Sequence, residues 1–409
     1  MNTKQVPEFP NFGTKSKKGN FCYARVTVIN MINVQNFGAV GDGKHNDYAA
    51  IQQALDAGER DILIPAGTYV VDAPLQVPSA RHIHADANAR IVFIASKPMT
   101  MKDFLITNAD VEDGNEDITI EGGIWDGGFG HPFNRKSQDI YEIKSTSGAC
   151  MNFVTVKHLR LLHLTVANPI AYYIRTGRIS EFEFRDITLT STLKNSNQDG
   201  IHFSGYCRNG LVEDIRAVPR GQTNDDLLAF NADDGIQRQE NRGLTSGPIE
   251  NIVCRNIYAE NCHSAIRMSS ITSAIRNIRI DNIYCGCRVY ALNMDALRYC
   301  RVPLFREDAA PNGVGNVSDV VISNMTAFYT EDGGRSESLI VLEQHCDNFE
   351  LVNFSRPLAL DAHPELPLLK ARYLTHQTIE ADGKVIGTLT DKQQECIVDG
   401  DVHSLKLTC

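Results

Sequence analysis

Acidic side chains stand directly ahead of two short apolar runs of the sequence. Asp199 precedes Gly-Ile-His-Phe, and Asp225 and Asp226 precede Leu-Leu-Ala-Phe, 26 and 27 residues further on. Hydrolysis of a glycosidic bond needs one carboxylic acid that protonates the leaving oxygen and a second carboxylate that activates water or attacks the sugar carbon. The residue types therefore suit a glycosidase, although aspartates ahead of strands also commonly do no more than cap turns.

Such chemistry requires elements that bring the three carboxylates together, and a sequence repeat can do so. Each copy has two apolar residues separated by one position, then two polar or small residues, often ending in Asn or Asp, then another apolar residue. The alternation predicts strands, and a period near 28 residues with insertions predicts one coil of a parallel β-solenoid. The last apolar residues of the copies, at intervals of 26–29 or 42 residues, are Leu159, Ile187, Ile215, Ile257, Ile283, Met325 and Phe354.

Residues one coil apart in a solenoid lie about 4.8 Å apart along its axis. Asp199 would then share one face with Asp225 and Asp226, and crowding of like charges raises the pKa of at least one carboxyl group. A carboxyl group that keeps its proton can act as a general acid. An ordinary β-sandwich is the alternative architecture.

A solenoid needs a cover at each end, because an open coil exposes apolar side chains and unpaired strand edges. Apolar residues at helical spacing over 47–57 predict a short capping helix with Asp47 as its N-cap. After its last copy the repeat is lost. We therefore predict an N-terminal extension over 1–32, a catalytic parallel β-helix over 33–355 and a C-terminal capping tail over 356–409.

Three landmarks in the first third of the chain resemble the pectate-lyase-like superfamily, whose members are right-handed parallel β-helices. They are Asn36-Phe-Gly-Ala-Val-Gly-Asp-Gly43, Ile62-Leu-Ile-Pro-Ala-Gly-Thr-Tyr69 and Ile118-Thr-Ile-Glu-Gly-Gly-Ile-Trp-Asp-Gly127. The order of the later motifs is most similar to family 28 glycoside hydrolases, the polygalacturonases and rhamnogalacturonases. The resemblance covers roughly residues 33–330 and implies an all-β fold, a single-stranded right-handed parallel β-helix.

Two of the four motifs of family 28 are matched here. The motif Asn-Thr-Asp-Gly is matched by Asn197-Gln-Asp199-Gly200, and Gly-Asp-Asp is matched by Asn224-Asp225-Asp226. The resemblance implies that Asp226 is the general acid, that Asp199 and Asp225 share the role of base, and that the reaction inverts the anomeric configuration. It also implies that Asn197 belongs to the substrate site.

The other two motifs are matched in part or not at all. Gly-His-Gly has no match, and either His202 or His263 could replace its histidine in orienting a catalytic carboxylate; otherwise both are ordinary hydrogen-bonded histidines. Arg-Ile-Lys is half matched by Arg267-Met-Ser269, and a guanidinium there could bind a substrate carboxylate or hydroxyl groups. Because Ser269 replaces the lysine, a neutral or differently charged sugar is favoured over galacturonic acid. Tyr290 matches a substrate-facing tyrosine one coil further on.

A second acidic pair, Asp233 and Asp234, follows the second apolar run. It could extend the acidic site or bind a cation such as Ca²⁺, but a solvated loop is the interpretation that we favour. Two further functions stay open on the same scaffold. One is a β-eliminating lyase or an epimerase with Arg267 as its base, and the other is a tailspike-like solenoid that binds carbohydrate without chemistry.

The amino-acid composition limits the classes of partner that the protein can bind. The 409 residues include 40 Lys and Arg against 50 Asp and Glu, a formal net charge of −10, and no basic cluster offers a place for a phosphate backbone, so we expect no nucleic acid partner. We also expect no membrane association, and a cytoplasmic location unless an export signal is missing from this sequence. The 11 cysteines predict buried thiols. We expect an oligosaccharide or polysaccharide as the partner, no cofactor and no bound metal, and we allow for a homo-oligomer.

Overall fold

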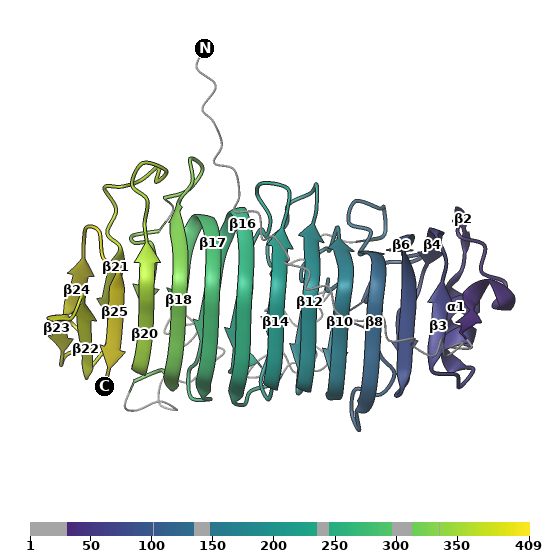
Figure 1. Cartoon of the computed structure of the whole chain (residues 1–409), viewed down its shortest axis with the longest axis horizontal. Coiled ribbons are helices and arrows are strands. Elements are labelled where there is room, and N and C mark those ends of the chain that lie inside the picture. The colour runs from purple at the N-terminus through teal and green to yellow at the C-terminus, as the bar shows by residue number, and fades with distance from the viewer. Residues whose placement is uncertain (1–30, 101, 135–147, 235–244, 297–312, 335) are drawn as a thin grey trace, which may run out of the picture. The chain divides into compact units, whose positions relative to one another are not determined.

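The computed structural model describes residues 31–100, 102–134, 148–234, 245–296, 313–334 and 336–409. Within these residues the chain is a right-handed parallel β-helix in which each strand pairs with its counterpart in the next coil (Figure 1). The predicted fold class is confirmed. Most of the predicted N-terminal extension lies outside the described residues. No helix of the described part is both long enough and apolar enough to cross a membrane.

Long strands form the body of each coil, and their side chains alternate between the core and the outside. Their order in the stack follows their order in the sequence. They are β6 (Arg81–Phe93), β8 (Asn115–Asp126), β10 (Val156–Ala167), β12 (Ser180–Thr190), β14 (Arg208–Ala217), β16 (Ile249–Ser269), β17 (Ile275–Met294), β18 (Val317–Tyr329) and β20 (Cys346–Ser355).

Shorter strands complete the coils and build the amino-terminal end. The first group is β1 (Ile32–Asn33), β2 (Asp42–Asn46), β3 (Asp61–Ile64), β4 (Gly67–Val71) and β5 (Leu75–Val77). The second group is β7 (Ile106–Asn108), β9 (Met151–Val154), β11 (Ile174–Gly177), β13 (Ile201–Phe203), β15 (Asp226–Asn231), β19 (Ile340–Leu342) and β21 (Leu369–Arg372).

The amino-terminal end is covered by α1 (Tyr48–Asp56), which packs against the short 3-10 helix η1 (Val34–Phe37) and against β5. This is the predicted capping helix, and its apolar residues are buried. Asp47 occupies the N-cap position, but its carboxylate accepts hydrogen bonds from the backbone N–H groups of Val40 (2.7 Å) and Gly41 (3.1 Å) and makes none with the helix. Asp47 therefore fixes the preceding loop against the helix.

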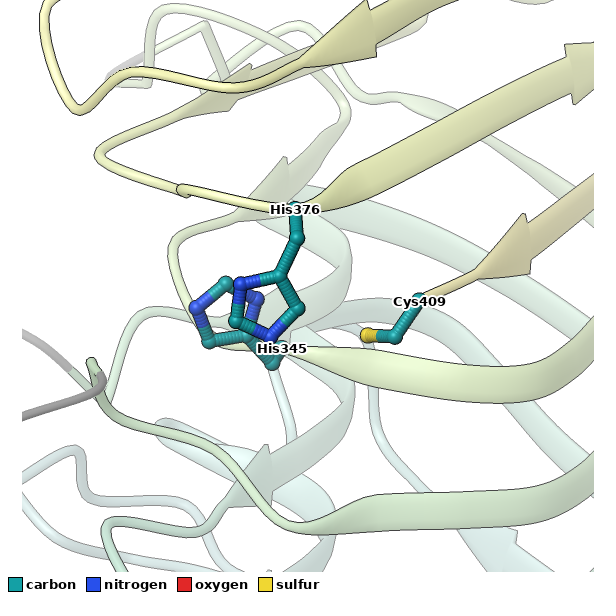
Figure 2. Close-up of side chains that lie close together, drawn as sticks. All are labelled: His345, His376 and Cys409. Atoms are coloured by element: carbon teal, nitrogen blue, oxygen red, sulfur yellow. The ribbon is translucent and has the colours of Figure 1, made fainter.

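Antiparallel strands cover the carboxyl-terminal end. β25 (Ser404–Thr408) pairs with β20 and with β22 (Gln377–Ala381), β22 also pairs with β23 (Lys384–Leu389), and β24 (Glu395–Val398) pairs with β21. Where β20, β22 and β25 meet, the side chains of His345, His376 and Cys409 lie close together (Figure 2). The last parallel pair, β19 with β21, lies partly inside the predicted tail.

The turn that ends each repeat explains its recurring Asn or Asp. Asn256, Asn282, Asn324 and Asn353 all adopt the left-handed conformation, with φ between 52° and 60°, which Asn tolerates better than most residues. Their side chains also hydrogen-bond from coil to coil, as from Asn282 Nδ2 to Asn256 Oδ1 (2.8 Å). The sequence repeat therefore reflects the backbone conformation of the turns as well as the packing of the core.

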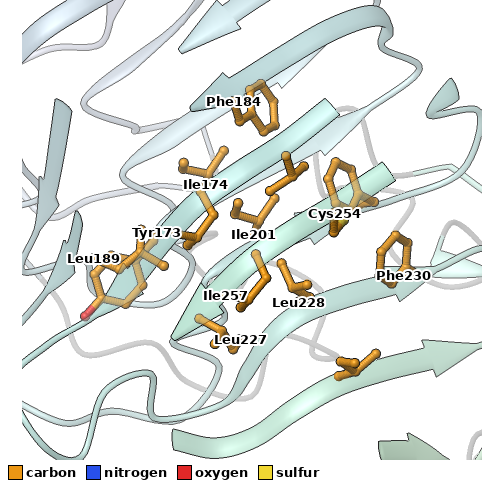
Figure 3. Packing of buried hydrophobic residues seen from close by; sticks show 14 of the residues in the cluster. Tyr173, Ile174, Phe184, Leu189, Ile201, Leu227, Leu228, Phe230, Cys254 and Ile257 are labelled. Carbon is orange, nitrogen blue, oxygen red and sulfur yellow. The ribbon is translucent and has the colours of Figure 1, made fainter. Parts of the chain in front are cut away.

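One row of short strands positions the candidate site. Ile174 of β11, Ile201 of β13 and Leu228 of β15 occupy equivalent positions in successive coils and are buried in the core (Figure 3). The row continues through Ile266 of β16 and Leu292 of β17. Because side chains alternate along a strand, the residues that directly follow this apolar row, among them Arg175, His202 and Arg267, face the opposite side of the sheet.

Candidate active site

Asp199 and Asp226 occupy equivalent positions in adjacent coils. Each stands two residues ahead of a core residue, Ile201 and Leu228, and these two core residues are register partners. The backbone N–H of Gly200 donates to the carbonyl oxygen of Asp226 (2.9 Å). The structure thus brings Asp199, Asp225 and Asp226 to one place on the sheet.

Asp225 is held by the backbone and is mostly buried, with part of its side chain exposed to solvent. One carboxylate oxygen accepts from the N–H of Asn197 (3.1 Å) and the other from the N–H of Asp226 (3.1 Å). Its side chain is 23% exposed, and Nδ1 of His263 lies 3.7 Å from Oδ1. Asn197, predicted to bind substrate, therefore contributes a backbone contact to this carboxylate.

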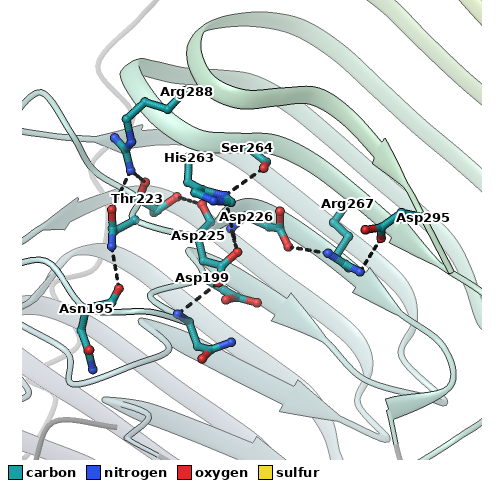
Figure 4. Close-up of polar contacts among 12 residues, drawn as sticks. Asn195, Asp199, Thr223, Asp225, Asp226, His263, Ser264, Arg267, Arg288 and Asp295 are labelled. Carbon is teal, nitrogen blue, oxygen red and sulfur yellow. Dashed lines mark hydrogen bonds and ion pairs between the residues drawn. The ribbon is translucent and has the colours of Figure 1, made fainter. Parts of the chain in front are cut away.

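Asp226 is buried beside a guanidinium group (Figure 4). Its Oδ2 lies 3.6 Å from Nη1 of Arg267, whose Nη2 donates to Oδ1 of Asp295 (2.7 Å). Its Oδ1 is buried and has no hydrogen-bond partner among the described residues. Arg267 is therefore placed between two carboxylates.

Asp199 is bound to a histidine instead. Nδ1 of His202 lies 2.7 Å from Asp199 Oδ2, and Nε2 lies 2.6 Å from Asp234 Oδ2. All three side chains are buried. A ring whose two nitrogens both contact carboxylates is best satisfied when both nitrogens carry a proton, because a carboxylate can only accept.

The interpretation of Asp233 and Asp234 as a solvated loop is wrong for Asp234, whereas Asp233 is a partly exposed loop residue. Asp234 is buried against His202. Asp233 accepts hydrogen bonds from the backbone N–H groups of Thr272 (2.8 Å) and Ser273 (3.0 Å), and from the hydroxyl of Ser273 (2.6 Å). The first acidic residue thus anchors a neighbouring loop, and the second extends the site.

A buried arginine supports the segment that carries the acidic pair. Arg288 of β17 donates to the side-chain oxygen of Asn224 (2.7 Å) and to the carbonyl of Thr223 (3.3 Å). Asn224 in turn donates to the carbonyl of Asn195 (2.8 Å), and the Thr223 hydroxyl donates to the carbonyl of Asp225 (2.8 Å). These contacts tie the loops of two adjacent coils together (Figure 4).

Burial perturbs the protonation of the whole cluster. Burial raises the pKa of Asp199. Burial and the negative charge of Asp199 raise the pKa of Asp225 to about 7. Burial and the negative charge of Asp225 raise the pKa of Asp226 to about 6. Burial opposes the charged form of His202, but Asp234 and Asp199 raise its pKa to about 9. Burial lowers the pKa of His263. Near neutral pH, Asp199 and Asp226 therefore contact cations, whereas Asp225 has a neutral imidazole beside it.

The remaining predicted residue, Tyr290, lies on the same row of the sheet. Its register partner in β16 is Ser264, and Ser264 is the register partner of Asp226. Ser264 also hydrogen-bonds Nδ1 of His263 through its hydroxyl (3.0 Å). Tyr290 is thus two coils from Asp226 along the row, and its role in binding substrate stays a prediction.

Asp234 and Asp295 are the site residues that the sequence did not reveal as partners. Asp295 stands 28 residues after Arg267, and Asp234 stands 32 residues after His202. The period of 28 residues pointed only near Asp295, because the register partner of Arg267 in the next coil is Asn293, two residues earlier. No comparable signal pairs Asp234 with the histidine.

Comparison with known proteins gives both a family and a fold. Residues 31–288 match the family described as rhamnogalacturonase A/epimerase, pectate lyase-like. A probable polygalacturonase of Arabidopsis thaliana is 23% identical over 266 residues, which are 58% of this chain and 53% of that protein. The chain spans about half the length of this curated relative and one fifth or less of three others that it matches.

Two solved structures share the fold at low sequence identity. The family 28 exopolygalacturonase of Yersinia enterocolitica is 18% identical, with a TM-score of 0.51 over 79% of this chain and 71% of that chain. A mutant tailspike protein of E. coli bacteriophage HK620, solved in complex with a pentasaccharide, is 12% identical, with a TM-score of 0.53 over 83% of this chain and 63% of that chain. The same fold thus occurs in a hydrolase and in a tailspike.

Proposed function

The chain belongs to the rhamnogalacturonase A/epimerase, pectate lyase-like family, and from that premise we propose that it is a glycosidase that hydrolyses O-glycosidic bonds in pectin-like or related oligosaccharides. The observation that carries the proposal is the gathering of Asp199, Asp225 and Asp226 from adjacent coils, in surroundings that separate their protonation states. Inversion of the anomeric configuration follows from the resemblance to family 28.

We assign the general acid to Asp225, in place of Asp226, which the resemblance suggested. Its pKa of about 7 is the higher of the two values in the acidic pair. It contacts no cation among the described residues, and its partly exposed side chain can reach a leaving oxygen from the solvent side. An acid with a pKa near the working pH is close to the optimum for proton transfer.

Asp226 and Asp199 share the role of base. Each lies beside a cation, Arg267 and protonated His202 respectively, that favours the ionised carboxylate. In the reaction, Asp225 gives its proton to the glycosidic oxygen as the bond to the anomeric carbon breaks. A water molecule attacks that carbon from the opposite face and loses its proton to one of the two carboxylates.

The charges around Arg267 favour a neutral sugar next to the cleaved bond. Asp295 and Asp226 already neutralise this guanidinium, and Ser269 stands where the family has its lysine. A uronate carboxylate would face five aspartates in this region, since Asp199, Asp225 and Asp234 are also present. In the cytoplasm, the location that the sequence predicts, the substrate would be a short oligosaccharide, because polymers do not enter the cell.

The two alternative functions have weaker support. A lyase would need Arg267 as its base, and a guanidinium between two carboxylates is held in its protonated form. A binding solenoid has the support of the tailspike fold. It gives no reason, however, for gathering three carboxylates of which two are buried beside a cation and the third, Asp225, is not.

The experiment compares wild type with Asp225→Asn on short uronide and neutral oligosaccharides, by measuring the reducing ends that are released. We expect release by wild type and a loss in kcat of about 100-fold or more in the variant. Asp186→Asn is a matched control, because Asp186 lies exposed in a turn of β12 and Asn tolerates its left-handed backbone. NMR of the first anomer released tests inversion.

Each other outcome has its own meaning. A larger loss in Asp226→Asn than in Asp225→Asn would return the role of acid to Asp226. A product that absorbs as a conjugated double bond would identify elimination by a lyase. Binding of an oligosaccharide without any release, by a folded protein, would identify a binding solenoid and contradict the proposal.

A further inference from the structure

A second group of ionisable side chains lies on the outer side of the first coils, on a different row of strands from the carboxylate cluster. His82 and His84 are two positions apart on β6, so both point to the same side of the sheet. Asp61 of β3 is the register partner of His82, and Glu121 of β8 is the register partner of His84. Three adjacent strands thus bring together two imidazoles and two carboxylates.

The donor atoms are close and are accessible from solvent. Oδ1 of Asp61 lies 2.9 Å from Nε2 of His84 and 3.6 Å from Nδ1 of His82. Oε2 of Glu121 lies 3.1 Å from Nε2 of His82. The side chains of Asp61 and both histidines are 18–22% exposed, and that of Glu121 is 41% exposed. A dissolved ion can therefore reach the group.

On the outer face of later coils, an arginine and not a pair of histidines lies beside the carboxylates. Arg185 of β12 lies 2.7 Å from Glu183 and 3.2 Å from Glu213, so an arginine neutralises the carboxylates there. Two imidazolium rings cannot substitute for that arginine. The rings of His82 and His84 have centroids 3.6 Å apart, and two positive charges at that separation repel each other. Imidazole nitrogens that lie beside carboxylate oxygens are instead a set of potential metal ligands.

We propose that Asp61, His82 and His84 bind a divalent transition metal ion, for which Zn²⁺ is the best candidate. Imidazole nitrogen and carboxylate oxygen are preferred ligands of Zn²⁺. Bonds of about 2.0–2.1 Å in a tetrahedron place ligand atoms about 3.3 Å apart. The distances of 2.9 Å and 3.6 Å from Asp61 Oδ1 to the two nitrogens bracket that value.

Glu121 does not bind the ion itself but orients one of its ligands, His82. Its hydrogen bond to Nε2 of His82 selects the tautomer that leaves Nδ1 unprotonated and directed toward Asp61. Carboxylates commonly fix metal-binding histidines in this way. Water takes the fourth position of the tetrahedron.

The ion would clamp three successive coils next to the capping helix. β3, β6 and β8 each contribute a side chain to the group, and α1 immediately precedes β3 in the chain. The ion has no part in the proposed hydrolysis. Its role is to stabilise the amino-terminal coils, so that metal content and activity can be measured separately.

The test uses untagged full-length protein from which metal has been removed with a chelator. Zn²⁺ is then titrated calorimetrically near neutral pH into wild type, His84→Asn, Asp61→Asn and a control, His163→Asn. His163 is an exposed histidine 3.0 Å from Asp186, and within the described part of the chain it belongs to no group of potential metal ligands. We expect wild type and the control to bind one equivalent that both site variants bind about tenfold more weakly or not at all. Zn²⁺ should raise the melting temperature of wild type and the control, but not of His84→Asn.

A second group of potential ligands makes a further control necessary. Donor atoms of His345, His376 and Cys409 also lie within 4.8 Å of one another (Figure 2). The His376→Asn variant should keep the equivalent that His84→Asn loses. The proposal is overturned if wild type binds no Zn²⁺, if His84→Asn and Asp61→Asn bind it like wild type, or if only His376→Asn loses it.

Discussion

Aspartate, glutamate and arginine form contacts from coil to coil in two regions of this β-helix, with different consequences. On the outer face of the long strands, Arg185 contacts Glu213 in the next coil and Glu183 on its own strand, with its side chain 39% exposed. On the row that includes β13, β15 and β16, Arg267 links Asp226 and Asp295 with its side chain 5% exposed. Both regions contain an arginine–carboxylate contact between adjacent coils, so burial is what distinguishes them. In the site, burial turns ordinary aspartates into groups with pKa values suited to acid–base chemistry.

The largest expected difference between the regions concerns stability. Arg267→Met leaves Asp226 and Asp295 buried without their cation, and removing one partner of a buried ion pair costs about 3–5 kcal/mol. Urea unfolding of wild type and the variant measures this loss. A loss below about 1 kcal/mol would mean that the two carboxylates neutralise themselves by protonation, and that the buried pair is not the structural element we describe.

His202 should make the free energy of unfolding of the protein fall at alkaline pH. Its pKa is raised from 6.5 to about 9 in the fold, so its contribution is complete below pH 6.5 and is lost as the pH rises through about 9. At about 1.4 kcal/mol per pKa unit this contribution is about 3 kcal/mol. The difference in unfolding free energy between wild type and His202→Asn should therefore shrink between neutral pH and pH 10. A constant difference across that range would contradict the protonated bridge between Asp199 and Asp234.

The pH dependence of hydrolysis should reflect the protonation of the two carboxyl groups of the acidic pair, Asp225 and Asp226. Asp225 must keep its proton, and its pKa is about 7, whereas Asp226 must lose its proton, and its pKa is about 6. A plot of kcat/KM against pH should therefore peak between about 6 and 7 and fall about tenfold per pH unit on either side. In Asp225→Asn, the residual activity should lose the alkaline limb. Persistence of that limb would assign it to another group.

The sequence predicted the architecture because a repeat of core residues and left-handed Asn turns dictates how coils stack. It also predicted that Asp199, Asp225 and Asp226 would meet, since one period separates Asp199 from the pair. It did not predict which cation each carboxylate contacts, because Asp295 and Asp234 lie after their strands, where loop geometry directs the side chain. The separations of 21 and 39 residues from His82 to Asp61 and Glu121 also differ from the period of 28.

The smallest expected effect tests whether burial is the correct explanation for the difference between the regions. Arg185→Met removes one cation from Glu183 and Glu213, which also contact Arg160 and Arg255 respectively. Such surface pairs contribute about 0–1 kcal/mol. Because dissolved salt screens exposed charges, this small loss should vanish at high ionic strength, whereas the loss in Arg267→Met should persist. If Arg185→Met and Arg267→Met destabilise the protein equally at every salt concentration, the contacts between coils and not the buried surroundings determine the strength of both networks. The perturbed pKa values of the site would then need another cause.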